Sequence, residues 1–276
     1  MKRKLFALAC ALLLLLCGCS AAPAQPATGA PETLTVTILS VGAADCIVLQ
    51  AGQQAAMIDA GHNGDAEDIL AFLDEQGIEK LDFLLLTHLD KDHIGGADIV
   101  MENMPIGVVY APDYDKDNKQ HDQYLEALGK LGIQPVHPTE PVSLTLGEAA
   151  ITLLPAARAE YEQSNDYSIM AELVYGESTF LFAGDAEAER LAEYLASTPM
   201  QDVDVLKVPH HGRESALSEE FFAYVKPAHA VITCEEKEMP DDSVVNFLNS
   251  LDAEVYGTVY GTVTVTSDGV NIAVTQ

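Results

Sequence analysis

One short run of the sequence, HLDKDH at His88–His93, places two histidines and two aspartates within six residues. Imidazole nitrogens and carboxylate oxygens are natural ligands of divalent cations, and a tight loop can direct them at neighbouring ions. The apolar run Leu81–Leu86 predicts a buried strand that leads straight into this loop, and the pair Gly95-Gly96 follows it. An exposed charged loop with accidental histidines fits these flanks poorly. We therefore predict a metal site here.

Three further polar clusters also follow predicted strands directly. Asp59 follows the run AAMI, Asp185 follows FLFAG, and the pair His210 and His211 follows DVLKVP. Loops at strand ends are where a rigid scaffold collects functional groups. We therefore expect functional side chains in each of these loops.

The elements that must position these loops follow from hydrophobic periodicity. Strands are predicted at 34–39, 46–50, 55–58, 81–86, 108–110, 142–146, 150–154, 168–174, 179–182, 203–208, 230–233, 253–259 and 263–274. Helices are predicted at 65–76, after 95–96, and at 122–131, 187–195, 218–224 and 242–251. Strand meanders mixed with surface helices indicate a layered α/β protein, with two sheets packed face to face and helices outside.

The N-terminus is typical of an export signal. The basic residues at 2–4 precede the apolar run Leu5–Leu16, which is too short to span a bilayer comfortably. The run ends in LCGC, which resembles a bacterial lipobox with Cys19 as the lipidated residue. An ordinary secretory signal cut near Ala22, or an uncleaved anchor, is the alternative. We expect a protein exported and lipid-anchored to the outer face of the bacterial cell membrane.

Composition then divides the chain into three parts. Residues 1–19 are the predicted lipoprotein signal peptide. Residues 20–33 are rich in alanine and proline and nearly uncharged, which is typical of a flexible tether. Residues 34–276 are sufficient for one domain of ordinary size.

The charge balance limits the kinds of partner. Three of the 14 basic residues lie at 2–4, so 11 remain against 43 acidic residues, a formal charge of −32. Such a balance opposes non-specific binding to phosphate backbones and to anionic lipid surfaces. We therefore expect no general DNA-binding face, and membrane contact only through the lipid anchor.

Two cysteines remain in the predicted domain, Cys46 and Cys234, and each lies in an apolar strand-like run. Buried thiols are the expected state. A disulfide between them is an alternative that the sequence leaves open outside the cytosol.

The metal-site loop carries a family resemblance. The run THLDKDHIGG at 87–96 resembles the metallo-β-lactamase superfamily signature T-H-x-H-x-D-H, with Asp90 where most members have the second histidine. It is also similar to the variant in the hydrolase domain of ComEC-type DNA-internalisation proteins. Further segments follow that group's pattern in order: MIDAG at 57–61, SNDYSIMAEL at 164–173, FLFAGDAE at 180–187, DVLKVPHHG at 204–212, KPAHAVIT at 226–233 and VTVTSDGVNIAV at 263–274.

The resemblance implies a four-layer αββα sandwich with a site for two divalent ions, Zn²⁺ or Mn²⁺, at one edge. His88 and Asp90 would hold one ion, and Asp92 and His93 the other. Asp185 would bridge the two ions. A metal-activated hydroxide would attack the substrate, with Asp92 central to catalysis.

The remaining assignments also come from the resemblance. One of His210 and His211 would complete the second metal, with His211 favoured, and the other would contact a phosphate oxygen or protonate a leaving group. Asp59 would fix the loop by hydrogen bonds from outside the ligand shell. The superfamily's middle ligand histidine has no equivalent. Three residues occupy that region: Asn165, Asp166 and Ser168. We expect them to lie outside the ligand shell, and the sequence leaves their role open.

Other departures concern substrate contacts. SVGAAD replaces the group's D-V-G-Q-G-D and keeps Asp45, Arg213 replaces a serine, and an N-x-x-G-H-P element is missing. The resemblance therefore predicts a metal-dependent hydrolase, a phosphodiesterase or nuclease-like enzyme, acting on a small molecule or a phosphodiester, with nucleic acid among the candidates. The alternatives are a lactone- or amide-hydrolysing enzyme of the same fold and a non-catalytic, lipid-anchored accessory protein in DNA uptake. The oligomeric state stays open.

Overall fold

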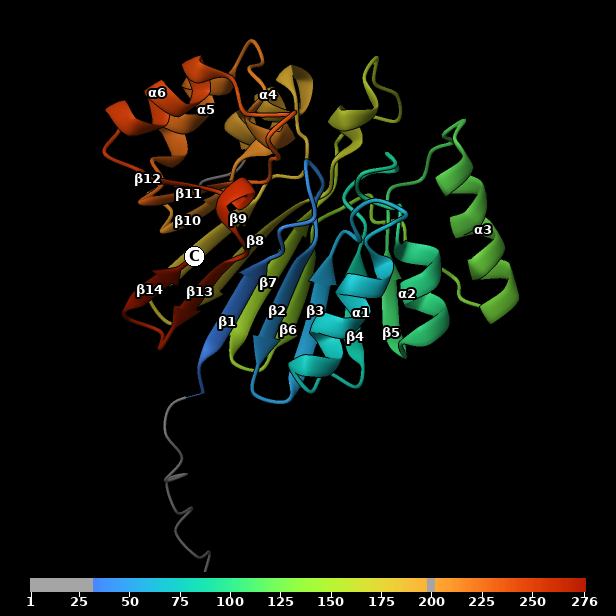
Figure 1. Cartoon of the computed structure of the whole chain (residues 1–276). Helices are drawn as coiled ribbons and strands as arrows, with labels where there is room; N and C mark the ends of the chain where they lie inside the picture. The colour runs from blue at the N-terminus through green and yellow to red at the C-terminus, as the bar shows by residue number, and fades with distance from the viewer. Residues whose placement is uncertain (1–31, 198–201) are drawn as a thin grey trace, which may run out of the picture. The chain divides into compact units, whose positions relative to one another are not determined.

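Two seven-stranded sheets organise the chain in a computed structural model that describes residues 32–197 and 202–276 (Figure 1). The predicted signal peptide, Cys19 and nearly all of the predicted tether lie outside the described residues. The first sheet has the order β14-β13-β1-β2-β3-β4-β5. Its strands, in chain order, are β1 (Leu34–Ile38), β2 (Ile47–Ala51), β3 (Gln54–Ile58), β4 (Leu81–Leu85), β5 (Ile106–Tyr110), β13 (Val263–Ser267) and β14 (Ile272–Thr275).

The second sheet has the order β12-β11-β10-β9-β8-β7-β6. Its strands are β6 (Val142–Leu146), β7 (Ala149–Leu154), β8 (Met170–Tyr175), β9 (Ser178–Phe182), β10 (Val205–Lys207), β11 (His229–Ile232) and β12 (Glu254–Gly257). In each sheet an antiparallel part joins a parallel part, which comprises β3–β5 in the first sheet and β9–β12 in the second.

Helices cover the outer face of each sheet (Figure 1). The α-helices are α1 (Ala66–Glu75), α2 (Ala97–Asn103) and α3 (Lys119–Leu131) on the first sheet, and α4 (Ala188–Ser197), α5 (Ser218–Val225) and α6 (Asp242–Ser250) on the second. Three short 3₁₀ helices are η1 (Ser164–Tyr167), η2 (Pro209–Gly212) and η3 (Thr258–Tyr260). The αββα sandwich predicted from the sequence is confirmed. Within the described ranges, no helix is both long and apolar enough to cross a bilayer.

Three apolar cores hold the four layers together. The core between the sheets contains fully buried residues of both, such as Val36 and Phe180. Met57 and Leu84 face the other way and pack under α1–α3, and Leu206 packs under α4–α6. Alternate residues of β3 and β4 thus enter two different cores. This explains why these strands read as continuous apolar runs in the sequence.

Local side-chain chemistry moves some element ends from their predicted positions. Helix α3 begins at Lys119 rather than at 122, because the Asn118 side chain accepts a hydrogen bond from the backbone N–H of His121 (2.7 Å) and caps the helix there. The predicted strand 263–274 is two strands, β13 and β14. They are separated by a turn in which the Asp268 carboxylate accepts a hydrogen bond from the backbone N–H of Asn271 (2.7 Å). Cys46 and Cys234 are buried and unpaired.

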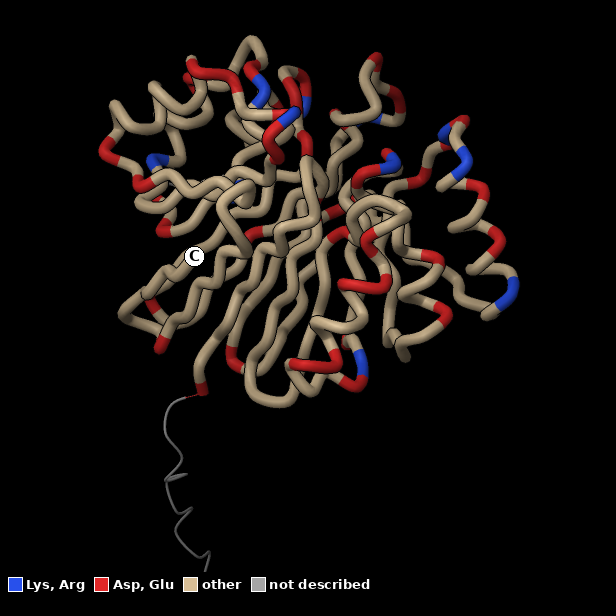
Figure 2. Tube along the Cα trace, in the orientation of Figure 1, with Lys and Arg blue, Asp and Glu red and all other residues tan. Residues whose placement is uncertain are grey.

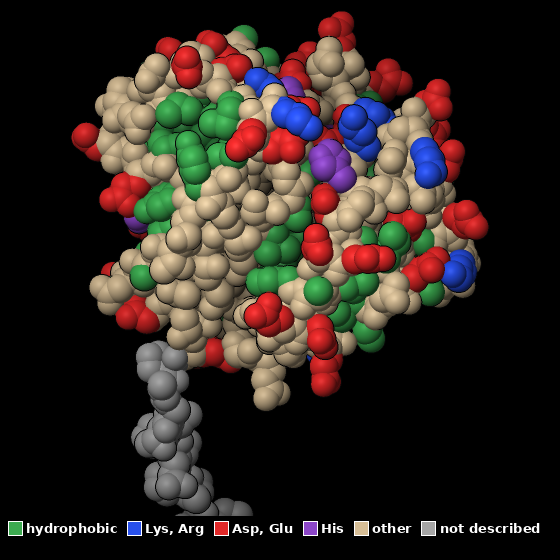
Figure 3. All heavy atoms as spheres, in the orientation of Figure 1, with side chains coloured by type: hydrophobic (Ala, Val, Ile, Leu, Met, Phe, Trp, Pro, Cys, Tyr) green, Lys and Arg blue, Asp and Glu red, His purple; other side chains and the backbone are tan. Residues whose placement is uncertain are grey.

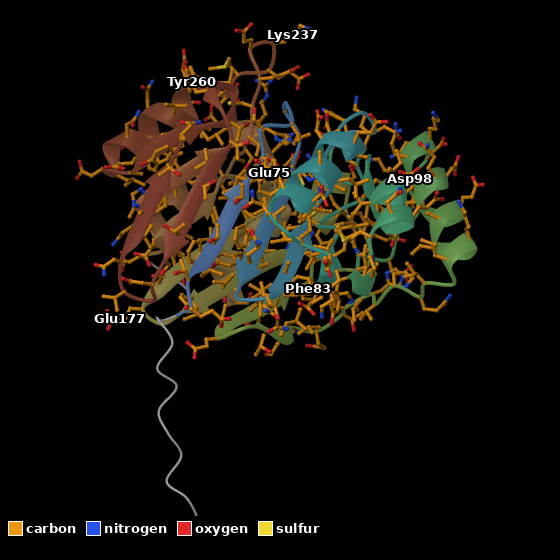
Figure 4. All side chains as sticks on the ribbon, turned by 60° about the horizontal axis from the view of Figure 1, so that its bottom comes forward. Glu75, Phe83, Asp98, Glu177, Lys237 and Tyr260 are labelled. Atoms are coloured by element: carbon orange, nitrogen blue, oxygen red, sulfur yellow. The ribbon has the colours of Figure 1, made fainter. Side chains whose placement is uncertain are left out.

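The parallel strands matter most for the site, because their carboxyl ends lie together at one end of the sheets. The loop after β11 carries Lys237 at this end, whereas Glu177, in the turn between β8 and β9, lies at the opposite end (Figure 4). The loops that follow β3, β4, β9 and β10 therefore reach the same region from two sheets.

Candidate metal centre

The four loops predicted to carry chemistry leave the sheets side by side. Asp59 follows β3 and His88 follows β4, and these two strands are parallel neighbours. Asp185 follows β9 and His211 follows β10, and these strands are parallel neighbours in the other sheet. Backbone hydrogen bonds join the loops, including Ala60 N–H to the His93 carbonyl (2.7 Å). The site is thus built where the ends of the two sheets meet.

Four of the predicted ligands form one compact set: Asp92, His93, Asp185 and His211. One ligand atom from each residue can be chosen so that all four lie within 4.8 Å of one another. The Asp185 Oδ2 atom is 3.2 Å from His93 Nε2 and 3.3 Å from His211 Nε2, and His211 Nε2 is 3.6 Å from Asp92 Oδ2. Atoms bound tetrahedrally at ~2 Å from one ion lie roughly 3.3 Å apart, so this set has the spacing of a metal site.

The nitrogen and oxygen atoms that point into the site are suited to binding a cation, because several of them have no hydrogen-bond partner. His88 Nε2, His93 Nε2, His211 Nε2 and Asp185 Oδ1 are all buried, and none makes a hydrogen bond. Buried polar atoms without a partner are costly, and in native proteins such atoms call for an explanation. A divalent ion bound by these atoms would supply it.

His88 lies beside this set, and its ring centroid is 4.1 Å from that of His93. Its Nδ1 atom is 3.1 Å from the Thr87 hydroxyl, which itself donates a hydrogen bond to Asp59 Oδ2 (2.7 Å). The Thr87 oxygen therefore accepts from His88 Nδ1, and the lone pair of His88 Nε2 is left free for a metal.

Asp90, the other predicted ligand of that ion, lies at the rim of the site. Its Oδ1 atom is 2.5 Å from Lys116 Nζ, and its Oδ2 atom accepts a hydrogen bond from the Ser164 hydroxyl (3.1 Å). The structure therefore gathers five of the six predicted ligands at the centre. It places the sixth, Asp90, in contact with a lysine.

Asp59 supports the centre through hydrogen bonds to the loop that carries the ligands. Its Oδ1 atom accepts a hydrogen bond from the Thr87 backbone N–H (2.7 Å), and its Oδ2 atom accepts one from His93 Nδ1 (2.8 Å). These bonds fix the His93 ring with Nε2 directed at Asp185. Asp59 adopts a positive φ of 59°, an uncommon conformation for a residue other than glycine, which its hydrogen bonds maintain.

His211, not His210, belongs to the compact ligand set. The His211 side chain is 8% exposed, and its Nδ1 atom lies 2.9 Å from the Thr233 hydroxyl. The His210 side chain is 31% exposed and turns toward Glu187, with Nδ1 3.4 Å from a carboxylate oxygen. Both histidines have positive φ values, 48° and 51°, and this kinked backbone sends the two adjacent rings in different directions.

The segment that replaces the superfamily's middle histidine has three different contacts. The Ser168 hydroxyl accepts a hydrogen bond from the Asp185 backbone N–H (3.2 Å) and so supports the loop that carries Asp185. The Asn165 amide donates to Glu187 (2.8 Å) and lies 3.3 Å from His210 Nε2. Asp166 accepts hydrogen bonds from the backbone N–H groups of Glu187 and Arg190, and thereby caps the start of α4.

Sequence reasoning assigned no role to two residues of the site, Asp45 and Lys207. The Lys207 ammonium contacts Asp45 Oδ2, lies 3.7 Å from Asp185 Oδ1 and donates to the Gly184 carbonyl (3.3 Å). The other Asp45 oxygen accepts a hydrogen bond from the Thr233 hydroxyl (2.7 Å). Both side chains are almost fully buried. The signal for Lys207 was a lysine inside an otherwise apolar strand, and that for Asp45 was its retention in SVGAAD.

The pKa values of the histidines at the centre depend on their burial and on the charged groups around them. Burial alone would lower the pKa of His211, but Asp185 and Asp92 outweigh it and raise the pKa to about 9. Burial likewise opposes protonation of His93, and Asp185 and Asp59 still hold its pKa well above the ordinary value. Burial, and then the charge of His93, lower the pKa of His88 to about 3. Without a bound cation, His93 and His211 therefore carry the positive charge that the carboxylates require.

Comparison with known proteins finds one matching family and several curated relatives. The family described as the metallo-beta-lactamase superfamily matches residues 39–234. ComE operon protein 3 of Bacillus subtilis (strain 168) is 28% identical over 165 residues, which are 60% of this chain and 21% of that protein. Recombination protein 2 of Haemophilus influenzae is 26% identical over 166 residues, 60% of this chain and 19% of that protein. The match thus spans about a fifth of each relative, and the expected ComEC-type relationship is confirmed.

Solved structures show the same fold. The metallo-beta-lactamase fold protein YhfI from Bacillus subtilis aligns with a TM-score of 0.58 at 15% identity, over 88% of this chain and 100% of that chain. A structure described as a new diphosphatase from the PhnP family aligns with a TM-score of 0.51 at 16% identity, over 85% of this chain and 98% of that chain. These likenesses concern the fold alone.

The raised histidine pKa values predict that metal binding displaces protons. Below pH 9 the His211 ring is protonated, so a cation must displace that proton, and apparent affinity should rise roughly tenfold per pH unit for each proton displaced. Titration calorimetry with Mn²⁺ or Zn²⁺ at pH 7, in buffers of different ionisation enthalpy, should register at least about one proton released per ion. An affinity that does not change between pH 6.5 and pH 9 would contradict the assignment of His211.

The buried ion pair of Lys207 and Asp45 predicts a large loss of stability for Lys207→Met. Loss of the ammonium leaves Asp45 charged and buried without its cation, which should lower the free energy of unfolding by about 3–5 kcal/mol in urea denaturation. Adding Asp45→Asn should recover part of that loss, because the unpaired charge is removed. Lys237→Met, at an exposed position, is the control and should change stability by less than about 0.5 kcal/mol. Equal stability of Lys207→Met and the wild type would refute the role of the pair.

Proposed function

The chain belongs to the metallo-beta-lactamase superfamily, and on that premise we propose that this metal-dependent hydrolase cleaves phosphodiester bonds. The observation that carries the proposal is the convergence of Asp92, His93, Asp185 and His211 on one point, with His88 beside them. Divalent cations at such a centre lower the pKa of bound water and polarise a phosphoryl oxygen.

The chain's own residues orient the reaction. Asp59 and Thr233 hold the His93 and His211 rings, so their Nε2 atoms are fixed before any ion arrives. His210 lies at the rim, partly exposed, and is held between Asn165 and Glu187. It is therefore placed to contact a phosphate oxygen or to give a proton to the leaving group.

The proposal of a phosphodiester substrate draws on the ligand set and on the proteins that this chain resembles. The ligand set is rich in carboxylates, which suits Mn²⁺ as well as Zn²⁺. A structure named as a diphosphatase shares the fold, and the relatives ComE operon protein 3 and Recombination protein 2 share the sequence pattern. On the face shown in Figure 3, histidine and basic side chains lie in one region, together with acidic side chains.

The overall charge restricts the size of the substrate. Acidic residues are distributed over the helices and loops, and basic residues are few (Figure 2). A surface of this sign repels a long polyanion, especially at low salt. A small phosphodiester, or a short end of a nucleic acid that reaches the rim alone, is therefore the favoured substrate.

Replacing one ligand should abolish turnover while the fold remains. For Asp92→Ala we expect kcat/KM on bis-p-nitrophenyl phosphate, with Mn²⁺ or Zn²⁺, to fall by at least about a hundredfold, because this loss disrupts the cation site. Asp122→Ala removes the same charge from an exposed position on α3 and should leave the rate unchanged. Circular dichroism should show that both variants keep the wild-type fold.

The same preparation separates the competing functions. A lactone, nitrocefin and single-stranded DNA are assayed alongside the phosphodiester. Turnover of the lactone or of nitrocefin alone would replace the proposal with the lactone- or amide-hydrolysing alternative. Bound metal with no turnover on any substrate would favour the accessory role in DNA uptake.

We also propose that the protein is exported and held at the membrane by lipid on Cys19. The Cys19→Ala variant should move from the membrane fraction to the soluble fraction or remain unprocessed, and should no longer incorporate a labelled fatty acid. Cys17→Ala, two residues earlier, is the matched control and should behave as the wild type. Lipid labelling that persists in Cys19→Ala would contradict the assignment.

A further inference from the structure

Lys116 occupies the side of the metal centre at which a second ion would bind Asp90. Its ammonium lies 2.5 Å from Asp90 Oδ1 and donates a hydrogen bond to the Ser164 hydroxyl (2.6 Å). Ser164 in turn donates to the other Asp90 oxygen (3.1 Å). One oxygen of this carboxylate thus accepts a hydrogen bond from Ser164, and the other has no hydrogen-bond partner but forms an ion pair with Lys116.

The loop that carries Lys116, residues 111–118 between β5 and α3, is fastened to the metal-binding loop. The Tyr114 hydroxyl accepts a hydrogen bond from the Leu89 backbone N–H (2.7 Å), and the Asn118 amide donates to the Leu89 carbonyl (3.2 Å). Leu89 lies between His88 and Asp90. The two loops therefore keep a fixed spacing, and the lysine is held within reach of Asp90.

A second contact ties the same loop to η1, which carries Ser164. The Tyr114 ring stacks on the Tyr167 ring, with centroids 4.0 Å apart and an interplanar angle of 17°. At its own backbone, the Lys116 carbonyl lies 3.0 Å from His121 Nδ1 in α3. Lys116, Ser164 and Asp90 thus meet because three segments are packed together, not because a long side chain happens to lie nearby.

The two halves of the metal centre consequently differ. In the compact set, Asp92 and Asp185 face the imidazole ring of His211, whose Nε2 atom is itself a metal-binding atom. At the other half, Asp90 faces a primary ammonium. An ion that binds Asp90 at this position must move the whole lysine side chain away from the carboxylate.

From this arrangement we propose that Lys116 is a tethered cation that competes with the second divalent ion for Asp90. The position formed by Asp92, His93, Asp185 and His211 fills first. The position formed by His88 and Asp90 fills only when the ion displaces the lysine. The inference rests on the metal centre of the proposed function but not on which ester is cleaved.

The test is a calorimetric titration of Mn²⁺ into the metal-free full-length protein at neutral pH. The wild type should bind two ions in separate steps, with the second at least about tenfold weaker than the first. In Lys116→Met the second step should tighten by about tenfold or more, and the first should change by less than about threefold. The partly exposed position of Lys116 makes the variant compatible with the fold.

Two matched variants make the result specific. Lys119→Met removes the same charge from an exposed position three residues along the chain and should change neither step. Asp90→Asn should remove or greatly weaken the second step in both the wild-type and the Lys116→Met backgrounds, which assigns that step to Asp90.

The outcomes that would overturn the inference are distinct from those that would overturn the metal centre. Two equally tight ions in the wild type, or an unchanged second step in Lys116→Met, would refute the role of Lys116 alone. No bound ion in any variant would refute the metal centre and the inference together.

Discussion

The need for positive charge among buried carboxylates is the constraint on which this structure depends. Asp45, Asp59 and Asp185 are almost completely buried at the point where the two sheets meet. Moving such groups out of water is very costly unless they are paired and hydrogen-bonded. Lys207 supplies one permanent charge, and the imidazoles around Asp185 supply a charge that a metal can replace. The buried carboxylates of the site therefore destabilise the fold unless a positive charge pairs with them, and the same carboxylates can bind a metal ion.

The sandwich is well suited to that constraint, because it brings the ends of parallel strands from two sheets to one place. Each of the loops after β3, β4, β9 and β10 supplies only one to four polar groups, and no single loop could surround an ion. Close backbone approach at the glycines completes the assembly. A Cβ atom at Gly95 would come within 2.4 Å of the Asn63 backbone, and so this position admits no side chain.

The centre is also asymmetric, and the asymmetry has a physical origin. In one half the carboxylates face imidazole rings, and in the other Asp90 faces the ammonium of Lys116. Exchangeable and tethered cations thus lie within one site, under a surface that is acidic overall. The positive groups at the rim attract the anionic group of a substrate. The negative charge of the surrounding surface limits how large that anionic substrate can be.

The sequence by itself determined the layered α/β class, most of the strands and helices, and the loops that carry the ligands. These features depend on local patterns: apolar periodicity, capping residues, and clusters of histidine and aspartate after strands. The resemblance to a known family then indicated the six ligands. Only the tertiary structure placed His211 and not His210 in the compact ligand set, because the kinked backbone sends the two adjacent rings in different directions. It also revealed the Asp45–Lys207 pair and the contact of Lys116 with Asp90, since these partners are 162 and 26 positions apart and only the packing of separate loops brings their charges together.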